Sequence, residues 1–383
     1  MKRKSAKDRK NIPPGGFLKP CFPAILSLPE RGQIVSPTKR RKRSLLIALL
    51  ASVAVSSLAA LFIGVSKMGI ADVLRVLSGH GSGSENRILF SIRLPRVLSA
   101  LIAGAGLASA GLIMQTTLGN PMASPSTLGV SNAAVFGANV AIIGFAGGFL
   151  STGRNPANYM TGANPFAVSG VALFFALAAI LLILGLTRIR AFSPSTVILS
   201  GVAMGSLFTA ATTILQFYAT DVGLSAAVIF SFGDLGRATY TTDLIMAAVV
   251  FPSIVVFWLL SSKYNAILSG EESSKSMGVR VGSLRLVSLF LSSVMTAVTV
   301  SFLGVIGFLG VVCPHIVKRL IGEDHFYTIP CSMLTGSLVL LIADTLSRTI
   351  GSGSALPVGA VTSLLGAPFF LFLLLRKGGH RHA

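Results

Sequence analysis

Long stretches of the chain contain no charged residue, and the polar positions that separate them come in short groups. A helix that crosses a membrane needs roughly 20 mostly apolar residues, so each stretch can hold one crossing and the first can hold two. The pattern therefore predicts a polytopic bundle of transmembrane helices. The charge-free stretches lie between Arg96 and Arg154, Arg154 and Arg188, Arg190 and Asp221, Asp243 and Lys263, Arg285 and Lys318, and Arg348 and Arg376.

Ten apolar segments are candidate spans, and together they predict an all-α fold, a polytopic transmembrane helical bundle of about ten spans. The eighth segment is short, so we expect a partial or re-entrant helix that is buried against its neighbours. The segments are Leu45–Val65, Val97–Thr116, Thr127–Gly147, Pro165–Leu186, Ser195–Phe217, Leu244–Leu260, Leu284–Leu303, Gly307–Val317, Ile329–Leu346 and Leu356–Leu375.

The distribution of cations orients these spans. If the N-terminus is cytoplasmic, ten crossings return the C-terminus to the cytoplasm and the cation-rich loops fall inside, as the positive-inside rule requires. The rule also favours counting Gly307–Val317, because Arg376 and Lys377 would otherwise lie outside. We therefore expect a multi-pass protein of the cell membrane with both termini cytoplasmic. The inside loops would hold Arg188 and Arg190, Lys263 to Arg285, Lys318 and Arg319, and Arg376 to Arg381.

Composition agrees with this interpretation and adds a basic N-terminal segment. The chain has 383 residues, of which 52% are hydrophobic and 11% charged, and its mean hydropathy is +0.78. Residues 1–44 contribute +11 of the net charge of +20, from 13 lysines and arginines against Asp8 and Glu30. The basic run Lys39 to Arg43 adjoins the first apolar segment, as positive-inside anchoring requires, so we expect a phospholipid partner and no nucleic acid.

These features divide the chain into three parts. Residues 1–44 are predicted to be a disordered cytoplasmic extension, since they contain several prolines and no sustained apolar period. Residues 45–376 are predicted to be the membrane domain, and residues 377–383 a cytoplasmic tail. We expect Leu45–Val65 to be an uncleaved first span, because the charged segment before a signal peptide is short.

Glycine, with 40 residues, recurs at close intervals within the predicted spans. Gly104, Gly106 and Gly111 stand in the second span with Ala108 and Ala110 between them. In lipid, small residues let helix backbones approach one another, so these glycines indicate helix packing rather than a ligand site.

The chain lacks the residue patterns of an enzyme or a metal protein. It has no GxxxxGK[ST] nucleotide-binding motif and no HExxH motif. His315, His325 and Cys313 do not have the spacing of metal ligands, and Cys21, Cys313 and Cys331 are too scattered for a disulfide framework. We therefore expect no catalytic residue, no cofactor and no metal in this chain.

A secondary transporter is an alternative, and it would need charged or broken-helix coupling sites near the middle of the bilayer. Asp344 is the main candidate for such a site. It stands four residues before Arg348, so we expect the two side chains to neutralise each other on one helix.

Cations also occur at positions that this orientation assigns to the outer side of the membrane. Arg93 and Arg96, in the sequence Arg-Leu-Pro-Arg, precede the second span, and Arg348 falls at the outer end of another. A guanidinium group pairs bidentately with phosphate and with carboxylate, so the partner would be lipid headgroups or a carboxylate-bearing protein.

Between the sixth and seventh spans, residues 268–279 are rich in Ser, Glu and Lys and end near a glycine. This composition predicts a short amphipathic cytoplasmic helix. Such a helix is too polar to lie in lipid and suits a soluble partner.

Read together, five motifs resemble those of the FecCD/BtuC-type permease family, in the family's order and over nearly all of residues 45–376. They are RLPR (93–96), GLIMQTTLGNPMASPSTLGVSNAA (111–134), GEESSKSMGV (270–279), GVIGFLGVVCPHIVKRLIGEDH (304–325) and LPVGAVTSLLGAPFFLFLLL (356–375).

The resemblance implies the permease subunit of a type II ABC importer that carries an iron chelate, a siderophore or haem, into the cytoplasm. A cobalamin importer of the same family is the alternative. The implied partners are a second permease copy (a homodimer or a close paralogue), two ABC ATPase subunits that hold ATP and Mg, and an extracytoplasmic substrate-binding protein.

The resemblance also implies roles for particular residues. The ATPase-coupling residues would be Gly270, Glu271, Glu272, Lys275 and Gly278, and the residues that dock the binding protein would be Arg93, Arg96 and Arg348. Ser193, Pro194 and Ser195 correspond to the inner gate, and the fifth span would line the pathway with Gly201, Met204, Gly205, Thr209 and Thr213. Pro194 and Ala355 depart from the family pattern, which often has a hydroxyl residue and a glutamate there.

Overall fold

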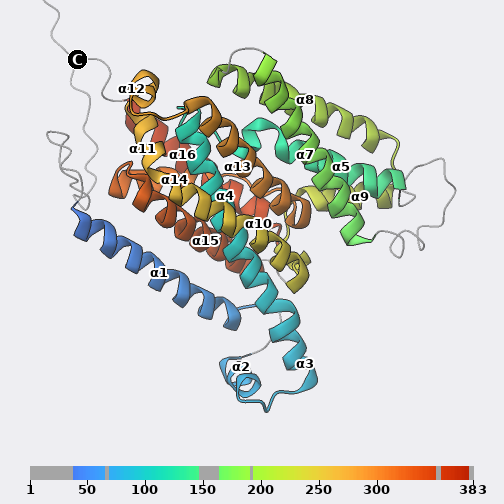
Figure 1. The fold of residues 1–383 in the computed structure, drawn as a ribbon. Coiled ribbons are helices and arrows are strands. Elements are labelled where there is room, and N and C mark those ends of the chain that lie inside the picture. Colours follow the sequence, from blue (N-terminus) through green and yellow to red (C-terminus); the bar gives the residue numbers. More distant parts are fainter. Residues whose placement is uncertain (1–37, 65–68, 146–163, 190–192, 351–354, 379–383) are drawn as a thin grey trace, which may run out of the picture. The chain divides into compact units, whose positions relative to one another are not determined.

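The computed structural model describes residues 38–64, 69–145, 164–189, 193–350 and 355–378, and within these ranges the regular structure is helical (Figure 1). Within the described ranges, seven helices are long and apolar enough to cross a membrane. They are α1 (Lys39–Phe62), the continuous run of α3 (Gly83–Asn86), η1 (Arg87–Arg93) and α4 (Leu94–Thr117), then α7 (Pro165–Ile189), α8 (Pro194–Phe217), α10 (Tyr240–Leu259), α13 (Val281–Leu303) and α15 (His325–Ile350).

All ten predicted apolar segments contain helix, so the predicted all-α class is confirmed. Three of the ten are shorter than a full crossing over their described apolar part, and the count of about ten crossings therefore stays a prediction. The three are α5 with η3 (Val130–Asn139 and Val140–Phe145), α14 (Leu309–Ile321) and α16 (Val358–Gly378).

Several boundaries differ from the prediction or lie outside the described residues. α1 begins at Lys39 rather than Leu45, so the basic run forms its first turns. Residues 1–37 of the predicted extension, Arg190, and residues 379–383 of the predicted tail lie outside the described residues. Val65 and Gly147, where two predicted spans end, lie outside them too.

The structure also contains short helices that the apolar pattern did not predict. Each of them is too short or too polar to stand out as a span, and they connect or flank the long helices. They are α2 (Ile70–Leu77), η2 (Pro125–Leu128), α9 (Asp221–Ser231), η5 (Leu235–Arg237) and α11 (Ser261–Leu268). The predicted cytoplasmic helix is present as α12 (Glu271–Ser276).

α4 is the central helix, and nearly all of its residues from Pro95 to Thr117 are buried. α13, α14 and α15 pack around it, and α1 lies along α15 (Figure 1). The backbone of α4 touches that of α15 at Gly104 and Gly336, and that of α14 at Gly111 and Gly310. The predicted role of these glycines in helix packing is thereby confirmed, because a Cβ at Gly104 or Gly111 would overlap the neighbouring carbonyl.

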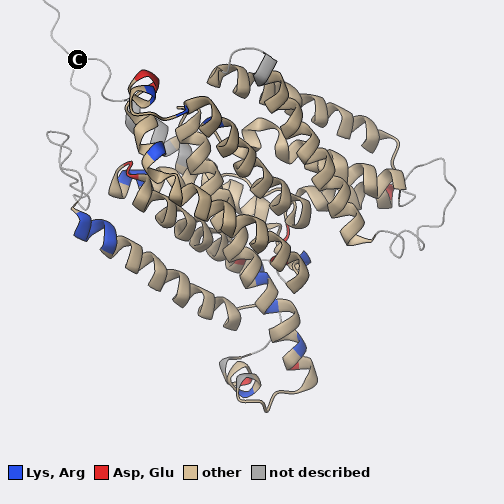
Figure 2. Cartoon of the chain, in the orientation of Figure 1, with Lys and Arg blue, Asp and Glu red and all other residues tan. Residues whose placement is uncertain are grey.

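A second group of helices, α5, α7, α8 and α9, packs beside α13 around its own apolar cluster. One face of α8 is left exposed, with Leu199, Val202, Leu207 and Ile214 among its exposed side chains. Charged residues collect at the ends of the helices (Figure 2). The fold thus has an apolar middle with polar groups at both ends.

Replacing Gly104 with Val should destabilise the bundle, because the new side chain would meet the backbone of Gly336 and force α4 and α15 apart. Overpacking of this kind costs about 1–3 kcal/mol. Thermal unfolding of the purified protein in detergent measures the effect. Gly170→Ala on α7 is the control, because nothing lies within 4 Å of its added Cβ. Equal unfolding temperatures for the two variants would contradict the role given to Gly104.

Candidate functional site

α12 is a short, exposed helix bounded by two glycines in the left-handed region of backbone conformation. Gly270 has φ +104° and Gly278 has φ +80°, conformations that glycine adopts without strain. Between them, the buried Ser274 hydroxyl lies 2.8 Å from the carbonyl oxygen of Ala266 on α11. This contact holds α12 against α11, so the segment is a defined projection rather than an open loop.

The charges of α12 are arranged around Glu271. Its carboxylate pairs with Lys275 and with Arg285 of α13, each at 3.0 Å. Hydrogen bonds from Lys275 and Arg285 lower the pKa of the Glu271 carboxyl, so it is charged at neutral pH. The five residues predicted for ATPase coupling, Gly270, Glu271, Glu272, Lys275 and Gly278, all lie on this exposed segment, and their coupling role stays a prediction.

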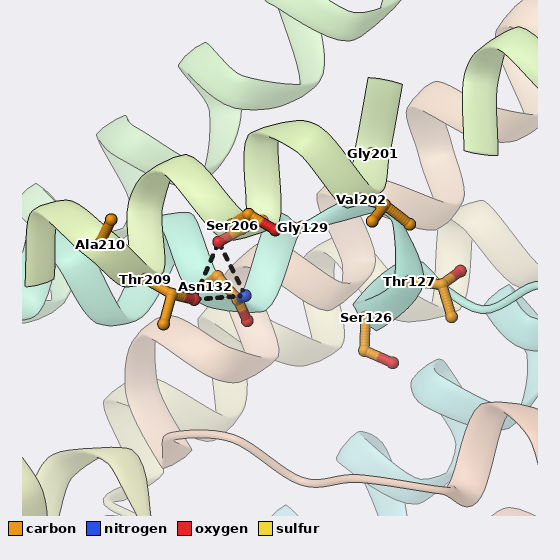
Figure 3. A pocket seen from close by; sticks show the side chains of 10 residues that line it. Ser126, Thr127, Gly129, Asn132, Gly201, Val202, Ser206, Thr209 and Ala210 are labelled. Carbon is orange, nitrogen blue, oxygen red and sulfur yellow. Dashed lines mark hydrogen bonds between the residues drawn. The ribbon is translucent and has the colours of Figure 1, made fainter. Parts of the chain in front are cut away.

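A groove of about 570 Å³ lies between α8 and the segment that contains η2 and the start of α5 (Figure 3). Its lining is made of small, hydroxyl and amide groups and contains no charged residue. The lining residues are Ser126, Thr127, Gly129, Asn132, Gly201, Val202, Gly205, Ser206, Thr209 and Ala210.

Hydrogen bonds join the two sides of the groove at its floor. The Asn132 amide donates to the Gly205 carbonyl at 3.1 Å and to the Thr209 hydroxyl at 3.0 Å, and that hydroxyl donates to the same carbonyl at 2.9 Å (Figure 3). A Cβ on Gly201 would lie 2.6 Å from the Cα of Leu128, so the two backbones are in contact there. Gly129, with φ +72°, allows the same close approach.

The predicted pathway residues divide between groove and core. Gly201, Gly205 and Thr209 line the groove, whereas Met204 packs into the apolar cluster beside α5 and α7. Thr213 is exposed but lies beyond the groove lining. Ser193, Pro194 and Ser195 form the start of α8, outside the groove, and their gating role stays a prediction.

The other groove residues were not predicted from the sequence: Ser126, Thr127, Gly129, Asn132, Val202, Ser206 and Ala210. The hydroxyl-rich stretch before Asn132, and the spacing of four between residues 202, 206 and 210 on α8, were the available signals. Pro194 occupies the first turn of α8, where its missing N–H has no intrahelical partner to lose.

At the other end of the bundle, the three predicted docking arginines are buried. Arg93, Arg96 and Arg348 are 3%, 8% and 5% exposed. Arg93 donates to the carbonyls of Leu61 at 2.6 Å and Phe62 at 3.2 Å, at the C-terminus of α1. The last carbonyls of a helix lack intrahelical donors, so an arginine at that position satisfies them and complements the helix dipole.

Arg348 acts on the same helix end and also binds a carboxylate. It donates to the carbonyl of Ile63 at 3.0 Å and pairs with Asp344 at 3.0 Å, which confirms the predicted pair on α15. Arg96 binds the same carboxylate at 2.7 Å. Asp344 and the α1 carbonyls therefore give all three arginines partners within the chain, which the sequence predicted only for Arg348, and their docking role stays a prediction.

The histidines and cysteines do not form a metal site in the described part of the chain, which contains no group of three or more His, Cys, Asp or Glu placed to hold a metal ion. Cys313 and Cys331 are free buried thiols, and Cys21 lies outside the described residues. His325 is buried and bonded to Asn265 and Thr116.

Comparisons with known proteins agree with one another. A family model described as the FecCD transport family matches residues 49–376. The chain is 47% identical over 331 residues to MJ0087 of Methanocaldococcus jannaschii, a protein named as an ABC transporter permease, covering 86% of this chain and 93% of the relative. It is 34% identical over 298 residues to the hemin transport system permease HmuU of Yersinia pestis, covering 77% of this chain and 85% of the relative.

A solved structure, described as a metal-chelate type ABC transporter in an inward-facing conformation, has the same fold. It matches with a TM-score of 0.75 and 25% identity, and the match covers 87% of this chain and 99% of that chain. The likeness therefore extends over the membrane domain as a whole.

Replacing Asp344 with Asn should strongly destabilise the end of the bundle at which Arg96 and Arg348 lie. Two buried guanidinium groups would lose their shared countercharge, and breaking a buried ion pair in this way costs about 3–5 kcal/mol. Asp72→Asn is the control, since Asp72 faces the exposed Arg75 at 3.5 Å and surface pairs contribute at most about 1 kcal/mol. Thermal unfolding in detergent compares them. If Asp344→Asn unfolds no earlier than Asp72→Asn, the buried cluster does not hold this end together.

Proposed function

The chain belongs to the FecCD transport family, and on that premise we propose that it carries an iron chelate, a siderophore or haem, into the cytoplasm. Members of the family are membrane-spanning permease subunits of ABC importers for iron chelates, haem or cobalamin. This chain is such a subunit, located in the inner membrane, and it is not itself an enzyme. ATP hydrolysis belongs to a separate ATPase subunit, and a substrate-binding protein is the further partner.

The lining of the groove is the observation that favours a bulky chelate as the substrate. Hydroxyl, amide and small apolar groups offer many weak contacts and no fixed charge, which suits a large ligand that must pass without being trapped. Similarity does not separate the two classes of substrate, since cobalamin permeases match this chain as well as the hemin permease does. The cobalamin importer is the second candidate, and the uptake experiment below separates the two.

We further propose that two copies meet along the exposed face of α8, so that the grooves together form the pathway. α8 is apolar and long enough to cross the membrane, yet much of it is left uncovered by the rest of the chain. A second copy of the same surface would cover it, as in symmetric dimers. The groove residues Ser206 and Thr209 would then face the shared pathway.

We place both termini on the cytoplasmic side, with α12 facing the ATPase. Lys42, near the start of α1, pairs with Asp324 at 3.0 Å, and the amide of Asn265 on α11 binds the same carboxylate at 3.1 Å. The basic start of α1 therefore lies at the same end of the bundle as α11 and α12. At the opposite end Arg93, Arg96 and Arg348 are buried and paired, so they add little exposed charge there.

In this arrangement, docking of the binding protein would involve exchange of partners. Acidic side chains of that protein would have to compete with Asp344 and with the α1 carbonyls for Arg93, Arg96 and Arg348. Such docking would loosen the outer end of α1 as it formed.

The proposed substrate is tested by uptake into vesicles that contain the permease with its ATPase. With the cognate binding protein present, we expect ATP-dependent accumulation of an iron-loaded siderophore or haem. Cobalamin serves as the competing substrate. Uptake of cobalamin without uptake of either iron chelate would contradict the proposal and establish the alternative. Because the ATPase supplies the energy, uptake should persist when the ion gradients are collapsed with ionophores.

The proposed pathway is tested by aqueous labelling of single cysteines. Cysteine at Ser206 or Thr209 should react with a polar thiol reagent, and the rate should differ between nucleotide-free and ATP-bound transporter. Thr212→Cys on the same helix is the control and should be protected, because Thr212 is buried against the bundle. Uniform protection of residues 206 and 209 in both nucleotide states would place the pathway elsewhere.

A further inference from the structure

The inner end of α4 is held by three other helices through three consecutive residues. The Gln115 amide donates to the Gly310 carbonyl on α14 at 3.2 Å. The Thr116 hydroxyl lies 2.7 Å from Nε2 of His325 on α15. The Thr117 carbonyl accepts a hydrogen bond from Nε of Arg285 on α13 at 3.1 Å. A carbonyl in the last turn of a helix has no intrahelical donor, and a cation there complements the helix dipole.

Arg285 binds α12 with the same guanidinium group. Its Nη1 lies 3.0 Å from the carboxylate of Glu271, while its Nε donates to Thr117. The side chain of Arg285 is only 12% exposed, which shelters its contact with Thr117, whereas the Glu271 carboxylate is 46% exposed. Because the guanidinium is planar and rigid, its two donors keep a fixed separation and thereby fix α12 relative to the end of α4. A lysine ammonium has a single nitrogen and could not span both partners in this geometry.

A second set of hydrogen bonds reaches α4 from α11. Although partial burial alone would raise the pKa of the Asp324 carboxyl, hydrogen bonds from Lys42 and Asn265 hold it below its usual value, so Asp324 is a carboxylate that only accepts. The Asn265 amide nitrogen therefore donates to Asp324. The amide oxygen accepts from the backbone N–H of His325 at 2.8 Å.

These hydrogen bonds determine which ring nitrogen of His325 carries a proton. The same oxygen of Asn265 lies 2.9 Å from Nδ1 of His325, so Nδ1 carries a proton, and Nε2 lies 2.7 Å from the Thr116 hydroxyl, which also donates to the Leu112 carbonyl at 3.1 Å. α11 and α12 are consequently joined to adjacent residues of α4, one through His325 and the other through Arg285.

The end of α4 in turn leads to the groove by a short, hydrogen-bonded segment. After Thr117 the chain turns at Gly119, which has φ +58°, and the N–H of Ala123 donates to the Asn120 carbonyl at 3.1 Å. Ser124 and Leu128 are buried, and Gly129 then abuts α8 at Gly201 and Gly205. The segment that joins the end of α4 to the wall of the groove is therefore short and held by hydrogen bonds.

We propose that Arg285 is a positioning residue that transmits movement of α12 to the end of α4 and so to the groove. This inference rests on the proposed function, because it takes α12 as the contact for the ATPase. Nothing in the sequence motifs singled out Arg285, which lies at the start of α13 and outside the GEESSKSMGV segment. Its role follows from the simultaneous contacts with Glu271 and Thr117.

The test uses the assembled importer, the permease with its ATPase and binding protein, in vesicles. Arg285→Gln removes both the charge and the paired donors. The importer should still assemble, as measured by co-purification of the ATPase, and ATP hydrolysis should continue near the wild-type rate. Uptake per ATP hydrolysed should fall by about ten-fold, within the range typical of coupling between two sites. Uptake per ATP hydrolysed by Arg285→Lys should lie between the values for the wild type and Arg285→Gln, since lysine keeps the charge but only one of the contacts.

Arg319→Gln is the matched control. Arg319 is an exposed arginine on α14, so this variant makes the same chemical change without touching α12 or α4, and it should keep the wild-type ratio. Thermal unfolding of each variant separates a coupling defect from a loss of folded protein, because a lower amount of folded protein reduces uptake and ATP hydrolysis together and leaves their ratio unchanged.

Wild-type uptake per ATP in Arg285→Gln, or a ratio lowered equally by Arg319→Gln, would overturn the inference. A failure of the proposed function has a different signature, since the wild-type assembly would then transport no iron chelate in the presence of ATP. Arg285 is supported as the link if the importer assembles normally and uptake per ATP hydrolysed falls in Arg285→Gln but not in Arg319→Gln.

Discussion

The structure depends on the nearly complete burial of α4. A helix in lipid gains little from the hydrophobic effect when it packs against another helix, so close van der Waals contact must hold the bundle together. α4 meets α15 and α14 at glycine backbones, and Gly111 with Gly310 is the tightest example. This packing leaves no room for a charged side chain in the middle of α4. Apart from the small Ser99 and Ser109, its polar residues lie at its two ends, where they define the two proposed functional regions of the chain.

At each end, polar groups that are removed from water require partners, and those partners fix the geometry. At the N-terminal end of α4, Arg96 and Arg348 share Asp344, and Arg93 joins Arg348 in capping α1. At its C-terminal end the last residues of α4 bind α13, α14 and α15, while α12 is held through Arg285. The central helix thus connects the region proposed for docking with the region proposed for coupling, and the groove lies just beyond its C-terminal end.

Much of the fold could be predicted from local sequence pattern, whereas the candidate site could be predicted only in part. Runs without charge predicted the apolar helices, and a spacing of four predicted the pair of Asp344 and Arg348, because both depend on neighbours in sequence. The bond between Arg96 and Asp344 joins residues 248 positions apart, so no periodicity could reveal it, and only Arg348 was expected to have a partner within the chain. Asn132 was missed for the same reason, since its partners on α8 are set by tertiary packing.

We propose that α12, α13 and the C-terminal end of α4 move as one unit that displaces α8. Structures of the assembled importer with and without an ATP analogue on the ATPase measure this directly. The account predicts that Arg285 keeps its contacts with Glu271 and Thr117 in both states, while α8 shifts relative to the second copy. It would be contradicted if α8 shifted between the two states while α12 separated from α4 and both Arg285 contacts were broken.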